Sequence, residues 1–224
     1  MEKISVSNVV EFRRKSTRSQ GTFINNLKRP KQDDTSGGGN YWVTSLSAVS
    51  KFYGSGDNEI ILDKLNELLE KFGKVTATTS KKMYQKNIEI LHNFEDFDFA
   101  KMKPEKGFSI VSRRNNKSII LIKGVPVQIA PNHVFTFKEN ENEKVGAILF
   151  VAKKDGYSVE EIAIFTDALY RYVKLNYSPK HEISKGYCIV LDVVNLKNGK
   201  YDQVENNNVN SLLESTLESI KKLL

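Results

Sequence analysis

The sequence has one cysteine, three histidines and five prolines, and it has no long apolar run. Cys188 cannot form an intramolecular disulfide, and its apolar neighbours at 189–191 predict an inert, buried thiol. Every apolar run is much shorter than the ~20 residues that a membrane-spanning helix needs, so we expect no membrane partner. The first residues lack the apolar segment of a secretory signal, which favours a cytoplasmic location.

Metal ligands and phosphate-binding motifs are also scarce. A structural zinc site needs clustered cysteine or histidine ligands, but His92, His133 and His181 are far apart in the sequence. The sequence contains neither a Gly-x-x-x-x-Gly-Lys-Ser/Thr loop nor a Gly-x-Ser-x-Gly elbow. We therefore expect no cofactor from these motif classes.

Positive charge is in excess. The chain has 34 Lys and Arg against 27 Asp and Glu, a net charge of +7, and residues 1–36 contribute +4 of it. This excess favours a polyanionic partner, DNA or RNA, although solvated loops could also carry such charges. The basic residues that we expect to contact phosphates are Arg13, Arg14, Lys15, Arg18, Lys28, Arg29, Lys31, Arg113 and Arg114.

Composition and hydrophobic periodicity predict three regions. Residues 1–40 are interpreted as a basic N-terminal arm with a glycine-rich linker, 41–107 as a helical lead-in, and 108–224 as a mixed-sheet α/β core with a C-terminal helix. Residues 41–224 are expected to form one compact unit. Apolar residues at helical spacing predict helices over 42–53, over 57–72 and from about 79 to 91.

The second half of the chain carries strand signals. Segments 118–122, 125–129 and 134–137 are β-branched or aromatic, and 145–151 is apolar throughout, as in a strand covered on both faces. A capping-box pattern at Ser158 and Glu161 opens a helix that ends before Pro179, and 187–194 is a second buried strand. The predicted fold class is therefore α/β (α+β), with a mixed central sheet, a parallel crossover and flanking helices.

The end of the chain offers a further partner hypothesis. We interpret 195–208 as a polar loop, and Ser211 and Glu214 repeat the capping-box spacing before an amphipathic segment. This C-terminal helix either packs on the core, which we favour, or docks onto a protein partner, as in a scaffold subunit of a larger complex.

From Ser118 to Val194, the order of elements resembles the core of the PD-(D/E)XK, restriction-endonuclease-like superfamily, particularly its RecB-like branch. In that family an acidic residue after a proline or glycine turn and a Glu-x-Lys on the central strand bind Mg²⁺ and orient the attacking water. Here the turn reads Gly124-Val125-Pro126-Val127, and the strand ends Val151-Ala152-Lys153-Lys154. Valines replace both carboxylates, so the resemblance implies a degenerate, non-cleaving relative that is associated with nucleic acid.

Two alternatives stay open. Acidic residues could have moved to the following helix, where Glu160, Glu161 or Asp167 would face Lys153, bind Mg²⁺ and support an active nuclease. His133 could act as a base or a ligand, or it could be a hydrogen-bonded structural residue. The weak catalytic candidates are thus Lys153, Glu161, Asp167 and His133.

Overall fold

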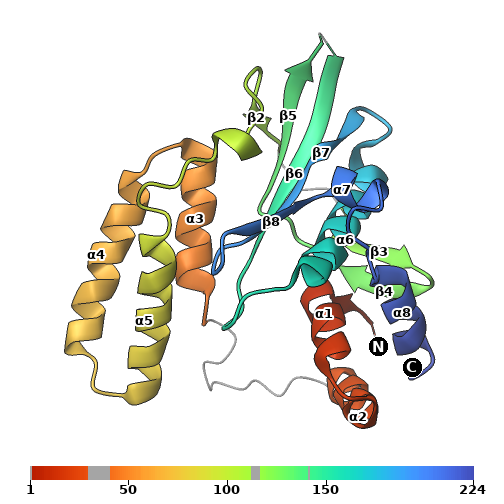
Figure 1. Cartoon of the computed structure of the whole chain (residues 1–224), viewed down its shortest axis with the longest axis horizontal. Helices are drawn as coiled ribbons and strands as arrows, with labels where there is room; N and C mark the ends of the chain where they lie inside the picture. Colours follow the sequence, from red (N-terminus) through yellow and green to blue (C-terminus); the bar gives the residue numbers. More distant parts are fainter. Residues whose placement is uncertain (1, 30–40, 112–116, 141) are drawn as a thin grey trace.

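A computed structural model describes residues 2–29, 41–111, 117–140 and 142–224, and it shows a mixed α/β fold, as predicted (Figure 1). The helices are α1 (Val6–Arg14), α2 (Thr17–Lys28), α3 (Val43–Ser55), α4 (Glu59–Lys74), α5 (Thr78–His92), α6 (Val159–Tyr177), α7 (Tyr201–Glu205) and α8 (Leu213–Lys221), with a 3-10 turn, η2, at Ala100–Met102. The strands are β1 (Ile4–Ser5), β2 (Ser109–Ile110), β3 (Ile119–Ile122), β4 (Val125–Gln128), β5 (His133–Glu139), β6 (Asn142–Val151), β7 (Glu182–Asp192) and β8 (Lys197–Lys200).

The central sheet has the strand order β2-β5-β6-β7-β8. Strands β5 and β6 form an antiparallel hairpin, while β6 and β7 are parallel and are joined by α6. The predicted crossover is therefore confirmed, with Ile148 of β6 opposite Ile189 of β7 and both fully buried. The register shifts between Val145 and Ala147, where Gly146 approaches the neighbouring strand closely.

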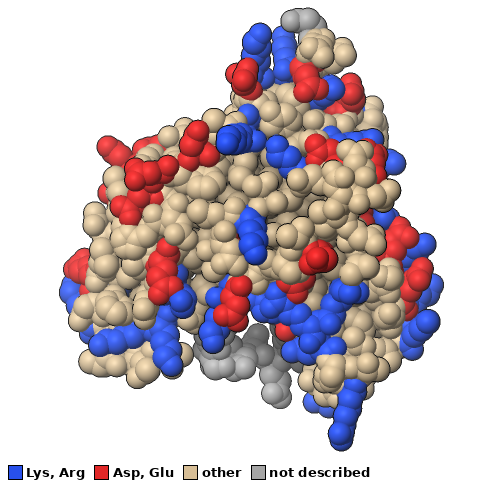
Figure 2. Space-filling view, viewed as in Figure 1, with Lys and Arg blue, Asp and Glu red and all other residues tan. Residues whose placement is uncertain are grey.

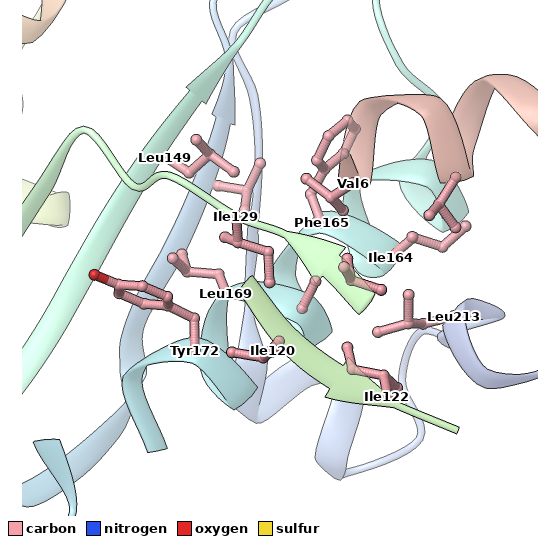
Figure 3. Close-up of a cluster of buried hydrophobic side chains, with 14 of the residues drawn as sticks. Val6, Ile120, Ile122, Ile129, Leu149, Ile164, Phe165, Leu169, Tyr172 and Leu213 are labelled. Carbon is pink, nitrogen blue, oxygen red and sulfur yellow. The ribbon is translucent and has the colours of Figure 1, made fainter. Parts of the chain in front are cut away.

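Helices cover both faces of this sheet. Helices α3, α4 and α5 lie on one side, and α6 lies on the other with α1 and α8 beside it (Figure 1). The first side is filled by aromatic rings, among them Tyr53, Phe99, Phe135 and Phe150. The second side is mainly aliphatic. Figure 3 shows side chains of α6 directed at those of the small sheet and of α8.

Strands β3 and β4 belong to a separate sheet with the order β1-β4-β3. Lys123 and Gly124 join them in a two-residue turn with φ of 52° and 79°, the left-handed conformation that type I′ hairpins require. The strands predicted at 118–122 and 125–129 exist as β3 and β4, but they pair with each other, β4 also pairs with β1, and both pack on α6 instead of extending the main sheet.

The N-terminal region differs from the expectation of an arm. Residues 4–28 form β1, α1 and α2, and Val9, Val10, Phe12 and Ile24 are at most 1% exposed. Apolar residues at 6, 9 and 10 have the i, i+3, i+4 spacing of a buried helix face, a signal that the basic run at 13–15 conceals. The glycine-rich linker expected near 32–40 lies outside the described residues.

The C-terminal helix packs on the core, as favoured, because Leu213, Leu217 and Ile220 of α8 are fully buried. Its apolar face is therefore not available to a protein partner. The capping box expected at its start does not form, since Ser211 Oγ donates to Asp167 Oδ2 at 2.8 Å. The region expected to be a polar loop contains β8 and α7, and β8 pairs with β7 through its backbone.

Candidate functional site

Lys153 lies in the loop between β6 and α6, at the carboxyl end of the parallel strand pair, where α/β folds commonly place their ligands. Its ammonium group forms a close ion pair with Glu11 Oε2 of α1. Lys15 Nζ lies 3.2 Å from the other oxygen of Glu11. The hydrogen bond from Lys153 lowers the pKa of Glu11, so this carboxylate keeps its negative charge, which the two lysines compensate.

A second ion pair lies beside the first. Arg14 contacts both carboxylate oxygens of Glu161, and its Nη2 donates to the Gly156 carbonyl at 3.1 Å. Glu161 also completes the predicted capping box, which is confirmed, by accepting the Ser158 amide at 2.9 Å. Burial by itself would raise the pKa of Glu161, but the hydrogen bonds from Arg14 and Ser158 outweigh it and lower the pKa.

The third carboxylate near this end of the sheet is Asp192, at the end of β7. It is fully buried and accepts the amides of Tyr157 at 2.8 Å and Val194 at 3.0 Å. Burial raises its pKa. These bonds hold the loop after β6 against β7, which is a structural role.

Nearby, a cavity of about 330 Å³ opens between α1 and β6, and the residues that line it are uncharged.

This arrangement does not provide a metal site. The Glu11 and Glu161 carboxylates both lie near Lys153, but the first is held by two lysines and the second by Arg14. Within residues 2–29, 41–111, 117–140 and 142–224, no cluster of three His, Cys, Asp or Glu side chains could hold a metal ion. The glycine and proline turn that the family resemblance pointed to, 124–127, lies in the small sheet, whereas the strand next to β6 is β5.

The remaining catalytic candidates are elsewhere. Asp167 binds Arg171 at 2.7 Å and Ser211, on the side of α6 that faces α8. His133 lies on the other face of the sheet, where its Nε2 is 2.9 Å from Ser50 Oγ and its ring stacks on Tyr53 at 5.6 Å. The structure thus brings Lys153 and Glu161 together but separates both from Asp167 and His133.

Two further acidic residues, Glu160 and Glu11, differ in their position relative to Lys153. Glu160 is exposed and accepts the Ser158 hydroxyl at 2.8 Å, so it does not face Lys153. Glu11, which does pair with Lys153, was missed by sequence reasoning. The pair spans 142 positions of the chain, and no local pattern marks it.

Basic side chains gather on α1 and α2. Residues 6–29 contain six Lys or Arg and one glutamate, a net charge of +5 of the total of +7. Figure 2 shows Lys and Arg side chains in blue over the region of these two helices. We call this region the α1–α2 surface, and its cations are Arg13, Arg14, Lys15, Arg18, Lys28 and Arg29.

Three of these six cations, Arg13, Arg18 and Arg29, have no carboxylate within ion-pair distance among the described residues. Arg13 donates to Thr216 Oγ1 at 3.1 Å. Lys28 donates to the Leu223 carbonyl at 3.2 Å and to an oxygen of the terminal Leu224 carboxylate at 3.0 Å. Arg18 and Arg29 are exposed. Lys31, Arg113 and Arg114, which we also expected to contact phosphates, lie outside the described residues.

Basic residues of α4 show a different pattern. Glu67 pairs with both Lys64 and Lys71, and Glu70 pairs with Lys74. Such i,i+3 and i,i+4 pairs cancel charge along the helix. Residues 6–29 therefore contribute most of the net positive charge of the chain, +5 of +7, although single unpaired lysines also lie elsewhere on the described surface.

No protein-family model and no curated protein matches this chain. The described helices include none with the length and apolar character to cross a membrane.

Proposed function

We propose that this chain is a nucleic-acid-associated protein that binds phosphates through the α1–α2 surface and does not cleave them. The observation that carries the proposal is the charge of +5 on 24 consecutive residues, in which Arg13, Arg18 and Arg29 have no acidic partner among the described residues. A dense array of cations attracts a polyanion by releasing its condensed counterions.

The chemistry of this surface favours the nucleic-acid backbone over the bases. Four of the six cations are arginines, whose planar guanidinium groups match phosphate oxygens with two hydrogen bonds. Phosphate contacts give affinity and orientation but little sequence selectivity. The expected ligand is therefore DNA or RNA of no fixed sequence.

Kinship to the PD-(D/E)XK superfamily is part of this proposal. It is supported by the antiparallel β5–β6 hairpin, by the parallel β6-α6-β7 crossover and by Lys153 at the end of β6. The absence of cleavage is supported by Val151 in the place of the strand carboxylate and by the paired state of Glu11 and Glu161.

The test is the binding of fluorescent 20-nucleotide single strands and 20-bp duplexes, of DNA and of RNA, followed by anisotropy. If four phosphates are neutralised, the duplex affinity should fall about 150-fold between 50 and 200 mM salt. The double variant Arg18→Glu/Arg29→Glu should lose binding by at least tenfold. The matched control, Lys81→Glu/Lys82→Glu on α5, carries the same charge change at two exposed lysines away from this surface.

Equal losses in the two double variants would show that only net charge matters, and the assignment to the α1–α2 surface would be wrong. Absence of salt-dependent binding to all four ligands would refute the function itself.

The alternative, an active Mg²⁺-dependent nuclease, is tested in the same preparations. We expect no cutting with Mg²⁺ or Mn²⁺, and cutting that is lost in Lys153→Ala would support the alternative.

A further inference from the structure

A groove of about 810 Å³ runs between β3 and α6. All four consecutive residues of β3 line it, and the opposite wall includes Tyr170, Lys174 and Leu175 of α6. Successive side chains of a strand point to opposite faces, so a groove that touches four in a row follows the edge of the strand. This edge is free among the described strands, because β3 is the last strand of the order β1-β4-β3.

The register of the hairpin shows which backbone groups point into the groove. Ile122 is opposite Val125 across the two-residue turn, which makes this a hydrogen-bonded pair, and hydrogen-bonded pairs then recur at every second residue of β3. The Ile129 amide donates to the Ser118 carbonyl at 2.8 Å, in agreement with this alternation. The N–H and C=O groups of Ile119 and Leu121 therefore point away from β4, toward α6.

At the start of this edge, the side-chain amide of Asn176 already makes the two hydrogen bonds that a neighbouring strand would make. The amide of Lys117 donates to Asn176 Oδ1 at 2.9 Å, and Asn176 Nδ2 donates to the Lys117 carbonyl at 3.2 Å. Lys117 is two residues before Ile119, so its backbone groups point to the same side. The side-chain amide of Asn176 thus satisfies the first position of a row that continues along β3.

The walls combine exposed apolar side chains with cations. Leu121 is 76% exposed, Leu175 52% and Ile119 40%, which is unusual for large aliphatic residues on one patch. Three cations line the groove, and none of its lining residues is acidic. Arg171 is bound to Asp167 and Glu214, but Lys117 and Lys174 are exposed and have no carboxylate partner among the described residues.

We propose that this groove binds an extended segment of a partner protein, which adds as a strand along β3 and carries both apolar and acidic residues. Outward N–H and C=O groups would pair with the partner's backbone, the aliphatic side chains would contact its apolar residues, and the lysines would contact its carboxylates. At about 3.3 Å per residue, the four residues of β3 accommodate about four to six residues of the partner.

Charge and wall chemistry favour this occupant over two others. Pairing β3 with β3 of a second copy would bring the two copies' basic grooves together, and like charges repel. A nucleic acid would find cations here too, but a row of backbone donors and acceptors between aliphatic side chains matches a peptide strand. The α1–α2 surface is separate, so this inference does not depend on the proposed function.

The experiment uses the full chain and an eight-residue peptide in which valine alternates with glutamate, with a valine–lysine peptide of equal length as its counterpart. We expect the acidic peptide to bind at least tenfold more tightly in anisotropy measurements. Hydrogen exchange followed by NMR should show at least tenfold slower exchange of the Ile119 and Leu121 amides when the acidic peptide is saturating. The amide of Val127, which belongs to the neighbouring strand β4, should be unaffected.

Two variants test the two sources of affinity. Leu121→Pro removes one outward donor from a position that makes no hydrogen bond to β4, and proline is tolerated on edge strands, so the hairpin should persist while binding falls at least tenfold. Lys117→Glu/Lys174→Glu should weaken the acidic peptide at least fivefold and strengthen the basic one. The control Lys81→Glu/Lys82→Glu, on α5, should change neither affinity.

Several outcomes would overturn the inference. Unchanged exchange of the Ile119 and Leu121 amides would show that no strand is added. A dimer that Leu121→Pro converts to a monomer would identify a second copy as the occupant. Slower exchange of these amides with a 20-nucleotide single strand but not with the peptide would identify nucleic acid instead. If the parent chain binds nucleic acid but does not bind the acidic peptide, this inference alone is refuted.

Discussion

Replacement of Phe12 by alanine tests whether the N-terminal helices are part of the core. The Phe12 side chain is 1% exposed and belongs to the same buried cluster as residues of α6 and α8. Removing a buried phenylalanine side chain costs about 3–5 kcal/mol, through lost burial and the cavity that remains. If residues 4–28 were a loosely attached arm, the same change would cost less than about 0.5 kcal/mol.

For a chain of this size, 1 kcal/mol corresponds to about 2–4 °C in Tm, so Phe12→Ala should lower the Tm by about 6–20 °C. Circular dichroism during heating and urea unfolding at 25 °C would both measure the change. Leu121→Ala is the control, because this side chain is 76% exposed and its loss should shift the Tm by less than about 2 °C.

A Tm of Phe12→Ala within about 1 °C of the parent would refute the packing argument, since no buried phenylalanine is removed at so small a cost. Phe12→Leu keeps the site filled if the alanine variant proves insoluble. Its loss of stability should be about 1–2 kcal/mol, intermediate between the parent and the alanine variant.

Three further predictions concern the sheet, the ion pairs and the thiol. Gly146→Ala would place a Cβ 2.7 Å from the Tyr187 carbonyl oxygen in the middle of the sheet, and should cost about 2 kcal/mol in urea unfolding. Glu161→Gln should cost about 1–2 kcal/mol at pH 7. Because folding lowers the pKa of Glu161, this difference should shrink progressively as the pH falls below the unfolded pKa and through the lower folded one, and an equal difference at pH 3 and pH 7 would contradict the ion-pair argument. Burial raises the pKa of Cys188 to about 12, so alkylation with iodoacetamide at pH 8 should require unfolding, and rapid labelling of the folded chain would contradict its buried position.

Elements with strong hydrophobic periodicity could be predicted from the sequence. The stripe at Ile61, Leu65 and Leu68 predicts α4, and the apolar run of β6 with the capping box at Ser158 predicts the crossover. In each case the apolar residues that are buried in the core are also the ones whose spacing defines the helix or strand pattern, so local pattern and tertiary packing agree. The parallel pairing of β6 with β7 followed from these elements.

Elements that depend on distant partners could not be predicted. Strand β8, Lys197–Lys200, has no buried side chain and is a strand because its backbone pairs with β7. Strand β1 has only two residues, which pair with β4 more than a hundred positions later. Helix α1 does carry an apolar face, but the basic residues that follow it led to the interpretation of an arm.

The candidate site combines both kinds of information. Its cations could be identified from the sequence, because charge is a property of composition. Their ion-pair partners could not be identified, because they are distant in the sequence. Lys153 and Glu161 have partners on α1, Glu11 and Arg14, that only the fold brings into contact.

Helix α1 therefore joins stability to the proposed binding surface. Phe12 on its inner face packs in the core. Glu11 binds Lys153 after the end of β6, and Arg14 binds Glu161 at the start of α6. The basic residues of its last turn are the first cations of the α1–α2 surface. Substitutions at Arg14 would disturb the fold and the charge together, so a loss of binding there would have two explanations. Arg18 and Arg29 are exposed and have no ion pair among the described residues, which is why charge reversal at these two positions separates binding from folding.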